Sequence, residues 1–405
     1  MKRMDRNRQF RVAIRKFAPF ESAIQKQWAH FEEAMHTGLE LQTVALDLHP
    51  LYEALIGSEG LQNGDWDVAF LSTDWMRNIF ASKLVVDLAP LIERNPPEGF
   101  PNGWTRSLLR LQEIEGKILG LPYHDGPECL IYRRDLFEDP SERRRYEDQF
   151  GTTLRPPETW AEFQRVASFF QRPENGLYGT VFAAYPDGHN TVYDFLLQLW
   201  TRGGELFDSS GVLCFDTAEA IEGLQFYRSL LKGGGPVHPS SKEFDSVQAG
   251  FAFARGEVAM MVNWFGFAAM AEALAESRVR KTVDIASVPR AIDGRHISLN
   301  AYWVLGLASA TPHRETGYAF IRHCASQAMD KLLTCEGGIG CRKSTWADPD
   351  VNAITPFYAR LEDLHALARE IPRIPEWPVI GSRIDALVMA VINSDRPIEE
   401  LVQEI

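Results

Sequence analysis

The stretch GKILGLPYHDGPECLIYRRDLF, from Gly116 to Phe137, decides how we divide the chain. It is apolar up to Leu121, breaks at Pro122 and again at Gly126 and Pro127, and then resumes as an apolar run before a charged segment. Short apolar runs bounded by Gly and Pro are typical of buried strands. The pattern therefore predicts two strands around a polar break, which is either a hinge between two domains or an ordinary surface turn.

Length and composition predict a globular protein of two domains. The chain has 405 residues, which exceeds the size at which a single hydrophobic core keeps growing. Its 42 Lys and Arg against 55 Asp and Glu leave a net charge of −13, which argues against a nucleic-acid partner. No window approaches the roughly 18 consecutive apolar residues of a membrane span. The basic start of the chain is not followed by an apolar segment, so no secretion signal is recognised.

The cysteines and glycines predict neither a metal site nor a nucleotide site. The five cysteines are an odd number, and no Cys-x-x-Cys pair or cluster of histidines accompanies them. We expect most of them to be buried thiols. The glycine-rich turn from Gly337 to Gly340 matches neither the dinucleotide fingerprint nor the phosphate loop. We therefore expect no metal and no cofactor.

Strands and amphipathic helices alternate along the chain, which predicts an α/β fold. A strand at Phe10 to Ile14, a helix at Phe20 to Gly38 and a second strand at Leu39 to Ala45 form one such unit. Further along, Thr159 with Glu162 three residues later predicts a capping box at the start of a helix. The second half of the chain is thus also expected to be α/β.

Polar and aromatic side chains follow two buried strands, one in each predicted domain. Asp74 and Trp75 come soon after the apolar run from Val68 to Leu71. Asn263 and Trp264 come at the end of a second apolar run. In open α/β sheets ligands bind beyond the carboxyl ends of the strands, so we expect the two pairs to form the walls of one cleft. The alternative is that Ser72, Thr73 and Asp74 cap the helix expected from Trp75 to Phe80, and both roles can hold together.

The order of these elements and motifs resembles the sugar-class extracellular solute-binding proteins of ABC transporters, the family that includes maltose-binding protein. The resemblance rests on the stretches GLPYHDGPECLIYRRDLFED, PPETWAEF, ARGEVAMMVNWFGFAAM, LNAYWVLGLASATPHRETGYAFIRHCAS and EGGIGCRKS. It implies a two-lobed clamp like that of periplasmic binding proteins, in which each lobe is a mixed or parallel sheet flanked by helices and hinge crossovers join the lobes. Lobe one would hold residues 1–124 and 297–340, lobe two residues 125–296 and 341–405, with the ligand cleft between them.

The resemblance also implies a function. The chain would be the substrate-binding component of an ABC importer, a monomer without enzymatic activity that captures a carbohydrate or sugar derivative in the periplasm and delivers it to the permease subunits. Sugars present apolar ring faces and a rim of hydroxyl groups, so their sites need aromatic platforms beside carboxylates, amides or guanidinium groups. The candidate ligand-binding residues are Asp74, Trp75, His124, Asp125, Asn263, Trp264, Asn300, Trp303 and Arg342.

Each of these assignments has an alternative. Any of the ten tryptophans can pack in a core, His124 can be only a hinge residue, and Arg342 can be only a salt-bridge partner. Arg342 beside His124 also leaves an acidic sugar open. Because no secretion signal is recognised, a cytoplasmic sugar-binding or sensing protein of the same fold is a second hypothesis. A glycoside-acting enzyme is a third, in which Asp74 and Asp125 would form the carboxylate pair.

Overall fold

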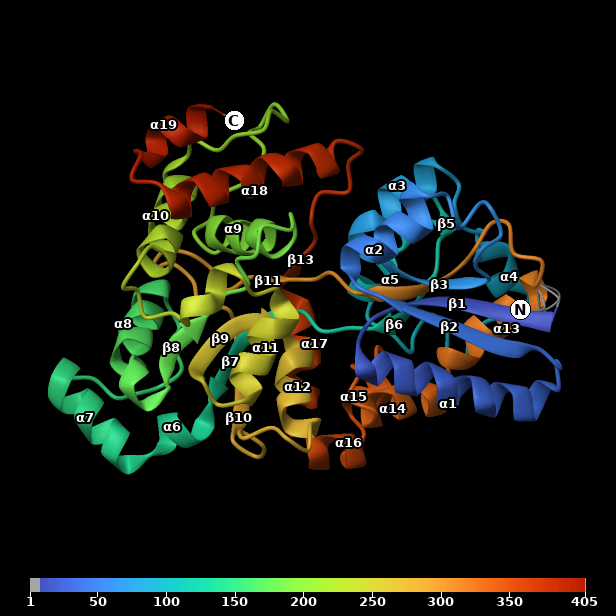
Figure 1. Ribbon diagram of the computed structural model, residues 1–405, viewed down its shortest axis with the longest axis horizontal. Coiled ribbons are helices and arrows are strands. Elements are labelled where there is room, and N and C mark those ends of the chain that lie inside the picture. The colour runs from blue at the N-terminus through green and yellow to red at the C-terminus, as the bar shows by residue number, and fades with distance from the viewer. Residues whose placement is uncertain (1–7, 405) are drawn as a thin grey trace, which may run out of the picture. The chain divides into compact units, whose positions relative to one another are not determined.

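The computed structural model describes residues 8–404, which form two compact units (Figure 1). We call them unit 1 and unit 2 and describe each by itself. Unit 1 holds the chain up to Gly126 together with Ala301–His365 and Glu370–Pro375. Unit 2 holds Pro127–Asn300, Ala366–Arg369 and the chain from Glu376 onward. The chain therefore passes between the units several times.

Unit 1 contains a five-stranded mixed sheet with the strand order β2-β1-β3-β12-β6. The central strand β3 (Val68–Ser72) is buried along its whole length, as its continuous apolar run predicts. On one side β1 (Gln9–Arg15) pairs with it in parallel, and β2 (Glu40–Leu46) pairs in parallel with β1 at the edge of the sheet. On the other side β12 (Trp303–Leu307) is antiparallel both to β3 and to β6 (Leu121–His124).

Helices cover both faces of this sheet. Figure 1 shows α1 (Ala18–Met35), α13 (Arg314–Cys324) and α14 (Gln327–Cys335) on one face, and α2 (Leu48–Tyr52) and α3 (Met76–Ala81) on the other. The remaining regular elements are η2 (Glu53–Gly57), η3 (Thr73–Trp75), α4 (Ala89–Arg94), α5 (Arg106–Leu111), β4 (Glu113–Ile114), β5 (Lys117–Ile118), α15 (Lys343–Trp346), α16 (Pro349–Ile354) and η6 (Tyr358–Arg360).

The helix expected to run from Phe20 to Gly38 ends earlier than predicted, at Met35. His36 adopts the left-handed conformation that closes the helix, with φ of 49°, and its N–H donates to the carbonyl of Glu32 at 2.9 Å. Gly38 has a positive φ of its own but lies beyond this cap.

Unit 2 contains a four-stranded mixed sheet with the strand order β10-β7-β9-β8. The strand β7 (Glu128–Arg133) is antiparallel to both β9 (Val258–Trp264) and β10 (Val283–Ala286), and β8 (Tyr178–Val181) is parallel to β9. A separate pair of short parallel strands joins β11 (Ser298–Leu299) to β13 (Ala368–Arg369). The polar break predicted after β6 thus lies between two strands that belong to different units.

The helices of unit 2 confirm the capping box predicted from the sequence. The predicted capping box opens α8 (Trp160–Phe170), where Thr159 and Glu162 each accept a hydrogen bond from the backbone N–H of the other. The apolar helix α9 (Asn190–Trp200) is buried at every residue, and Figure 1 shows α18 (Trp377–Asn393) lying along it. The other helices of unit 2 are α6 (Arg134–Glu138), α7 (Pro140–Phe150), η4 (Pro173–Asn175), α10 (Ala218–Leu231), η5 (Pro239–Lys242), α11 (Ser246–Ala254), α12 (Phe265–Ala273) and α19 (Ile398–Gln403). The helix α17 (Leu361–Leu367) begins in the segment of unit 1 that ends at His365, and its last two residues belong to unit 2.

Two compositional expectations can be compared with the structure. All five cysteines are free thiols, and three of them, Cys129, Cys324 and Cys341, are buried. None of the helices between residues 8 and 404 has the length and apolar character that a membrane crossing requires.

The observed units differ from the predicted lobes mainly in residues 341–365, which are predicted in lobe two but lie in unit 1. The reason is the buried carboxylate of Asp330 in α14. It accepts hydrogen bonds from the backbone N–H groups of Cys341 at 2.8 Å and Arg342 at 3.2 Å, and from the hydroxyl of Thr345 at 2.6 Å. These bonds hold the chain after the glycine-rich turn in unit 1.

Two smaller corrections concern the boundaries beside the crossovers. Asp125 lies in unit 1 rather than lobe two, because its backbone N–H donates to the carbonyl of Ile339 at 3.0 Å. Residues 297–300 lie in unit 2 rather than lobe one, because the hydroxyl of Ser298 donates to the carbonyl of Glu128 at 2.5 Å.

We predict that Asp330→Asn lowers the free energy of unfolding by about 2 kcal/mol, because at least one buried donor loses its acceptor. Urea unfolding followed by circular dichroism measures the effect. The matched control is Asp350→Asn, which changes an exposed carboxylate on the adjacent α16. Equal unfolding midpoints for the two variants would show that Asp330 does not hold this segment.

Candidate functional site

Three strand ends of unit 1 bring predicted site residues together. Trp303, the first residue of β12, pairs in register with Ser72 at the end of β3 and with His124 at the end of β6. The ring of Trp75 lies edge-on to that of Trp303, with the centroids 5.6 Å apart. We call Asp74, Trp75, His124 and Trp303 the unit 1 rim. Within it Trp75 is buried, whereas the other three side chains are partly exposed.

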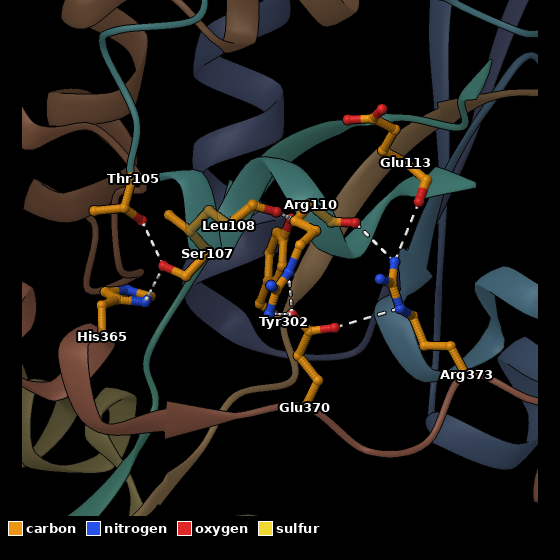
Figure 2. A network of polar contacts seen from close by, with 9 residues as sticks. All are labelled: Thr105, Ser107, Leu108, Arg110, Glu113, Tyr302, His365, Glu370 and Arg373. Atoms are coloured by element: carbon orange, nitrogen blue, oxygen red, sulfur yellow. Dashed lines mark hydrogen bonds and ion pairs between the residues drawn. The ribbon is translucent and has the colours of Figure 1, made fainter. Parts of the chain in front are cut away.

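Main-chain and hydroxyl contacts of Thr73 and Tyr302 hold the rim in place. The N–H of Thr73 donates to the carbonyl of Tyr302 at 3.0 Å, and the Thr73 hydroxyl accepts from the N–H of Tyr302 at 3.1 Å. Figure 2 shows that the buried hydroxyl of Tyr302 in turn reaches the carbonyl of Leu108 in α5, and it also donates to the side chain of Gln112. The Thr73 hydroxyl therefore positions Trp303 instead of capping the helix that follows.

His124 presents a neutral donor at the rim. Its Nδ1 accepts a hydrogen bond from the N–H of Ile339 at 2.9 Å, so the proton of the neutral ring is on Nε2. Burial of most of the ring lowers the pKa of His124 to about 4, an effect that the nearby Asp125 only partly opposes. The ring packs edge-on against Phe20, with the centroids 4.7 Å apart. At neutral pH His124 can therefore donate to a ligand without carrying charge.

Asp125 lies in the interior of unit 1. It is 2% exposed, and its Oδ2 is 2.6 Å from Nε2 of His365. The ring of His365 stacks on Trp346 at 5.1 Å, and its Nδ1 lies 3.2 Å from the hydroxyl of Ser107 (Figure 2). Both Asp125 and His365 directly precede points at which the chain leaves unit 1. The pair thus ties two chain passages together inside this unit.

The returning segment Glu370–Pro375 is anchored on the end of α5. Arg373 Nη1 donates to the carbonyls of Arg110 at 2.8 Å and Glu113 at 3.1 Å, while Arg110 Nε donates to Glu370 at 2.6 Å (Figure 2). Carbonyls at the end of a helix lack partners within the helix, and a guanidinium satisfies them well. These contacts are structural and explain why the segment belongs to unit 1.

Arg342 is also part of the interior of unit 1. It is 1% exposed, its Nη1 donates to the carbonyls of Glu98 and Ala325 at 2.8 Å each, and its guanidinium lies 4.4 Å from the centroid of the Trp104 ring. The predicted ligand contact would require these bonds to break. The geometry assigns Arg342 to packing instead.

Unit 2 places Trp264 at the end of β9, opposite Glu128 at the start of β7. The ring of Trp264 is partly exposed and lies edge-on to Tyr193, with the centroids 5.6 Å apart. Asn263 is 4% exposed, and its side chain accepts from the N–H of Trp264 at 2.8 Å and donates to the carbonyl of Ser246 at 3.1 Å. Asn263 thus orients Trp264 through the backbone.

Two buried carboxyl groups near Trp264 escaped the sequence analysis. Asp194 in α9 accepts a hydrogen bond from the hydroxyl of Tyr227 at 2.7 Å. Burial raises the pKa of Asp194 to about 7, and burial followed by repulsion from Asp194 raises the pKa of Glu128 well above its usual range. The two groups therefore do not both ionise near neutral pH. An isolated Asp in the apolar run of α9 is the sequence signal that points to this acid pair.

Asn300 completes the polar groups at this end of unit 2. Its backbone N–H donates to the carbonyl of Arg369 at 3.0 Å, but neither side-chain amide atom has a hydrogen-bond partner among the described residues, although the residue is only 2% exposed. One carboxyl oxygen of Glu128 is also buried without a hydrogen-bond partner among the described residues. Buried polar atoms without partners are costly, so these two side chains are suited to bind a ligand or water molecules.

The nine predicted site residues thus fall into three groups. Partly exposed side chains at strand ends are Asp74, His124, Trp264 and Trp303. Buried side chains adjoining them are Trp75 and Asn300. Side chains used inside one unit are Asp125, Asn263 and Arg342.

Two α/β units with mixed sheets, joined by several chain passages and carrying aromatic and polar groups at their strand ends, are the architecture of a two-lobed binding protein. The family model described as bacterial extracellular solute-binding protein matches residues 14–331. The chain belongs to this family, which confirms the prediction made from its motifs.

Individual relatives agree with this assignment. The mannitol-binding protein of Pseudomonas aeruginosa is 24% identical over 395 residues, which cover 90% of this chain and 84% of that protein. A ribitol complex of an ABC transporter solute-binding protein from Agrobacterium radiobacter K84 has a TM-score of 0.85 at 22% identity, covering 98% of this chain and 96% of that chain. A maltose-bound protein of T. maritima has a TM-score of 0.84 at 21% identity, covering 98% and 97%. These structures confirm the predicted two-lobed α/β fold.

The acid pair predicts an unusual pH dependence of stability. Because the pKa of Asp194 is about 7 in the folded protein and 3.8 without the fold, the folded chain holds a proton that the unfolded chain releases between these values. Its stabilising contribution is complete below about pH 4 and is lost as the pH rises toward 7. Asp194→Asn keeps an acceptor for Tyr227 and cannot ionise. It should melt several degrees above the unchanged protein at pH 8 and within a degree or two of it at pH 4.

The matched control is Asp148→Asn, which changes an exposed carboxylate on α7 of the same unit. Differential scanning calorimetry from pH 4 to pH 8 makes the comparison. If the melting temperatures of the Asp194 and Asp148 variants follow the same pH curve, Asp194 is ionised at no extra cost and the acid pair does not exist.

Proposed function

We propose that this protein binds a neutral polyhydroxyl compound, a sugar or sugar alcohol, and delivers it to the permease of an ABC importer. Membership of the extracellular solute-binding family supports the general role. The named ligands of its relatives, mannitol, ribitol and maltose, support the ligand class. Closure of the two units on the ligand, residence in the periplasm and the absence of enzymatic activity belong to the same proposal.

The observation that carries the proposal is the composition of the unit 1 rim. The partly exposed ring of Trp303, backed by Trp75, lies beside His124, whose ring is neutral at pH 7. An aromatic face suits the C–H surface of a sugar or polyol, and a neutral N–H donor suits a hydroxyl oxygen. An acidic ligand would gain no charge partner from these side chains.

Unit 2 supports an uncharged ligand for a related reason. Glu128 and Asp194 offer carboxyl oxygens, which accept hydrogen bonds from hydroxyl groups but repel a carboxylate. Arg342 was the reason to consider an acidic sugar as the ligand. That reason no longer holds, because its guanidinium donates to two carbonyls inside unit 1. We therefore favour a neutral ligand. The mannitol-binding and ribitol-bound relatives favour a sugar alcohol, with a cyclic sugar as the second candidate.

A thermal-shift screen tests the ligand class. We expect D-mannitol or ribitol to raise the melting temperature by several degrees at millimolar concentration, since a ligand that binds only the native state stabilises it. Maltose represents cyclic sugars, and D-glucuronate represents acidic ones. A response to glucuronate alone would contradict the neutral site, and no response to any sugar or polyol would contradict the function.

Trp264→Ala tests the aromatic platform of unit 2. We expect the Kd for D-mannitol to rise about tenfold or more, because an aromatic contact contributes on the order of 1 kcal/mol beyond the burial of its area. Phe251→Ala, which removes a partly exposed ring from α11 of the same unit, is the control and should bind normally. Calorimetry measures both. Unchanged binding with a large loss of stability in Trp264→Ala would make Trp264 a core residue.

A further inference from the structure

A pocket of about 660 Å³ lies in unit 2, and none of its lining side chains is discussed above as a ligand contact. Two stretches of chain line it, one that precedes β11 and one that includes β13. The lining residues are Arg290, Gly294, Arg295, His296, Ile297, Ala366, Leu367, Ala368 and Arg369. Its volume falls within the range of about 300–1,000 Å³ that is usual for small-molecule sites. All of its lining belongs to one unit.

The pocket carries more positive than negative charge. Arg290, Arg295 and Arg369 line it, and the carboxylate of Glu205 pairs with two of them, Arg295 and Arg369. Glu205 accepts two hydrogen bonds from Arg369, at 3.0 and 2.7 Å, and lies 3.6 Å from Arg295. One carboxylate therefore faces two guanidinium groups. The chain as a whole has a net charge of −13, so the local charge at this pocket is opposite in sign to that of the protein.

Arg290 adds a third cation that is held by main-chain groups. Its Nη1 donates to the carbonyls of Ala291 at 3.1 Å and Ile292 at 2.6 Å, which fixes the side chain without neutralising it. Arg369 is fixed as well, because its guanidinium stacks 4.4 Å from the centroid of the Trp200 ring. Cationic groups that are already oriented lose little conformational entropy when an anion binds.

The other part of the lining is apolar. Ile297, Ala366, Leu367 and Ala368 contribute it, next to the arginines. Guanidinium groups bind carboxylates and phosphates through paired N–H donors, whereas aliphatic side chains favour the carbon skeleton of an organic molecule. The lining therefore combines recognition of an anion with recognition of a carbon framework.

We propose that this pocket binds a small organic anion that carries at least two carboxylate or phosphate charges. Such a ligand differs in charge from the neutral compound proposed for the strand ends and uses none of the same side chains. The site therefore does not depend on the function proposed above. Carboxylate and phosphate share the chemistry that the arginines recognise, and the choice of probes distinguishes them.

Isothermal titration calorimetry at low ionic strength tests the proposal with citrate, glycerol phosphate and inorganic sulfate. We expect citrate or glycerol phosphate to bind the unchanged protein, and the tighter of the two identifies the anionic group. Sulfate should bind at least about tenfold more weakly, because it has no carbon skeleton to contact the apolar lining. Equal affinity for sulfate and the organic anions, or no binding of either organic anion, would overturn the proposal.

Arg295→Gln is the test variant, because this side chain is exposed and its removal leaves the pair of Arg369 with Glu205 intact. It should weaken binding of the organic anion about fivefold or more. Arg144→Gln removes the same charge from an exposed position on α7 and should leave the affinity unchanged. Equal losses in both variants would indicate general charge attraction and would overturn the pocket. An unchanged melting temperature of Arg295→Gln would confirm that the variant is folded.

Discussion

The rest of unit 1 depends on the main-chain hydrogen bonds that β12 makes to two strands at once. The strand inserts between β3 and β6, although it comes from a part of the chain that follows almost all of unit 2. Its first residue, Trp303, consequently meets the ends of both neighbours, Ser72 and His124. A strand with two antiparallel partners leaves no free edge in the middle of the sheet, so the chain must return to unit 1 to complete it.

This constraint also explains the chemistry of the rim. Because Trp303 and His124 lie at strand ends that are packed on apolar neighbours, their polar atoms have few partners within the protein, and the imidazole stays neutral. Charged groups near the same segments instead have partners within unit 1. Asp125 is hydrogen-bonded to His365, and Arg342 donates to two carbonyls and is stacked on Trp104. Asp125 and Arg342 thus hold the chain inside unit 1, whereas the uncharged Trp303 and His124 remain partly exposed at the rim beside Asp74.

The buried polar groups of unit 2 differ from those of unit 1 in having fewer hydrogen-bond partners. Its acid pair and the amide of Asn300 are enclosed without enough partners to satisfy them. Such groups reduce stability unless a function requires them. These groups lie near Trp264, which Asn263 orients through its backbone. We therefore interpret the loss of stability as a consequence of the ligand-binding role that we propose.

The sequence by itself determined the elements whose reasons are local. The apolar run of β3, the capping box at Thr159 and the break before Pro127 each follow from neighbouring residues, and the order of the motifs identified the family. It also predicted that Trp264 lies at the end of a buried strand. Only the tertiary structure decided which polar side chains remain partly exposed, because Asp125 and Arg342 bond to groups that are far away in sequence, His365 and the carbonyl of Glu98. The acid pair could not be predicted for the same reason. Glu128 and Asp194 are far apart in sequence and become neighbours only when α9 packs near β7.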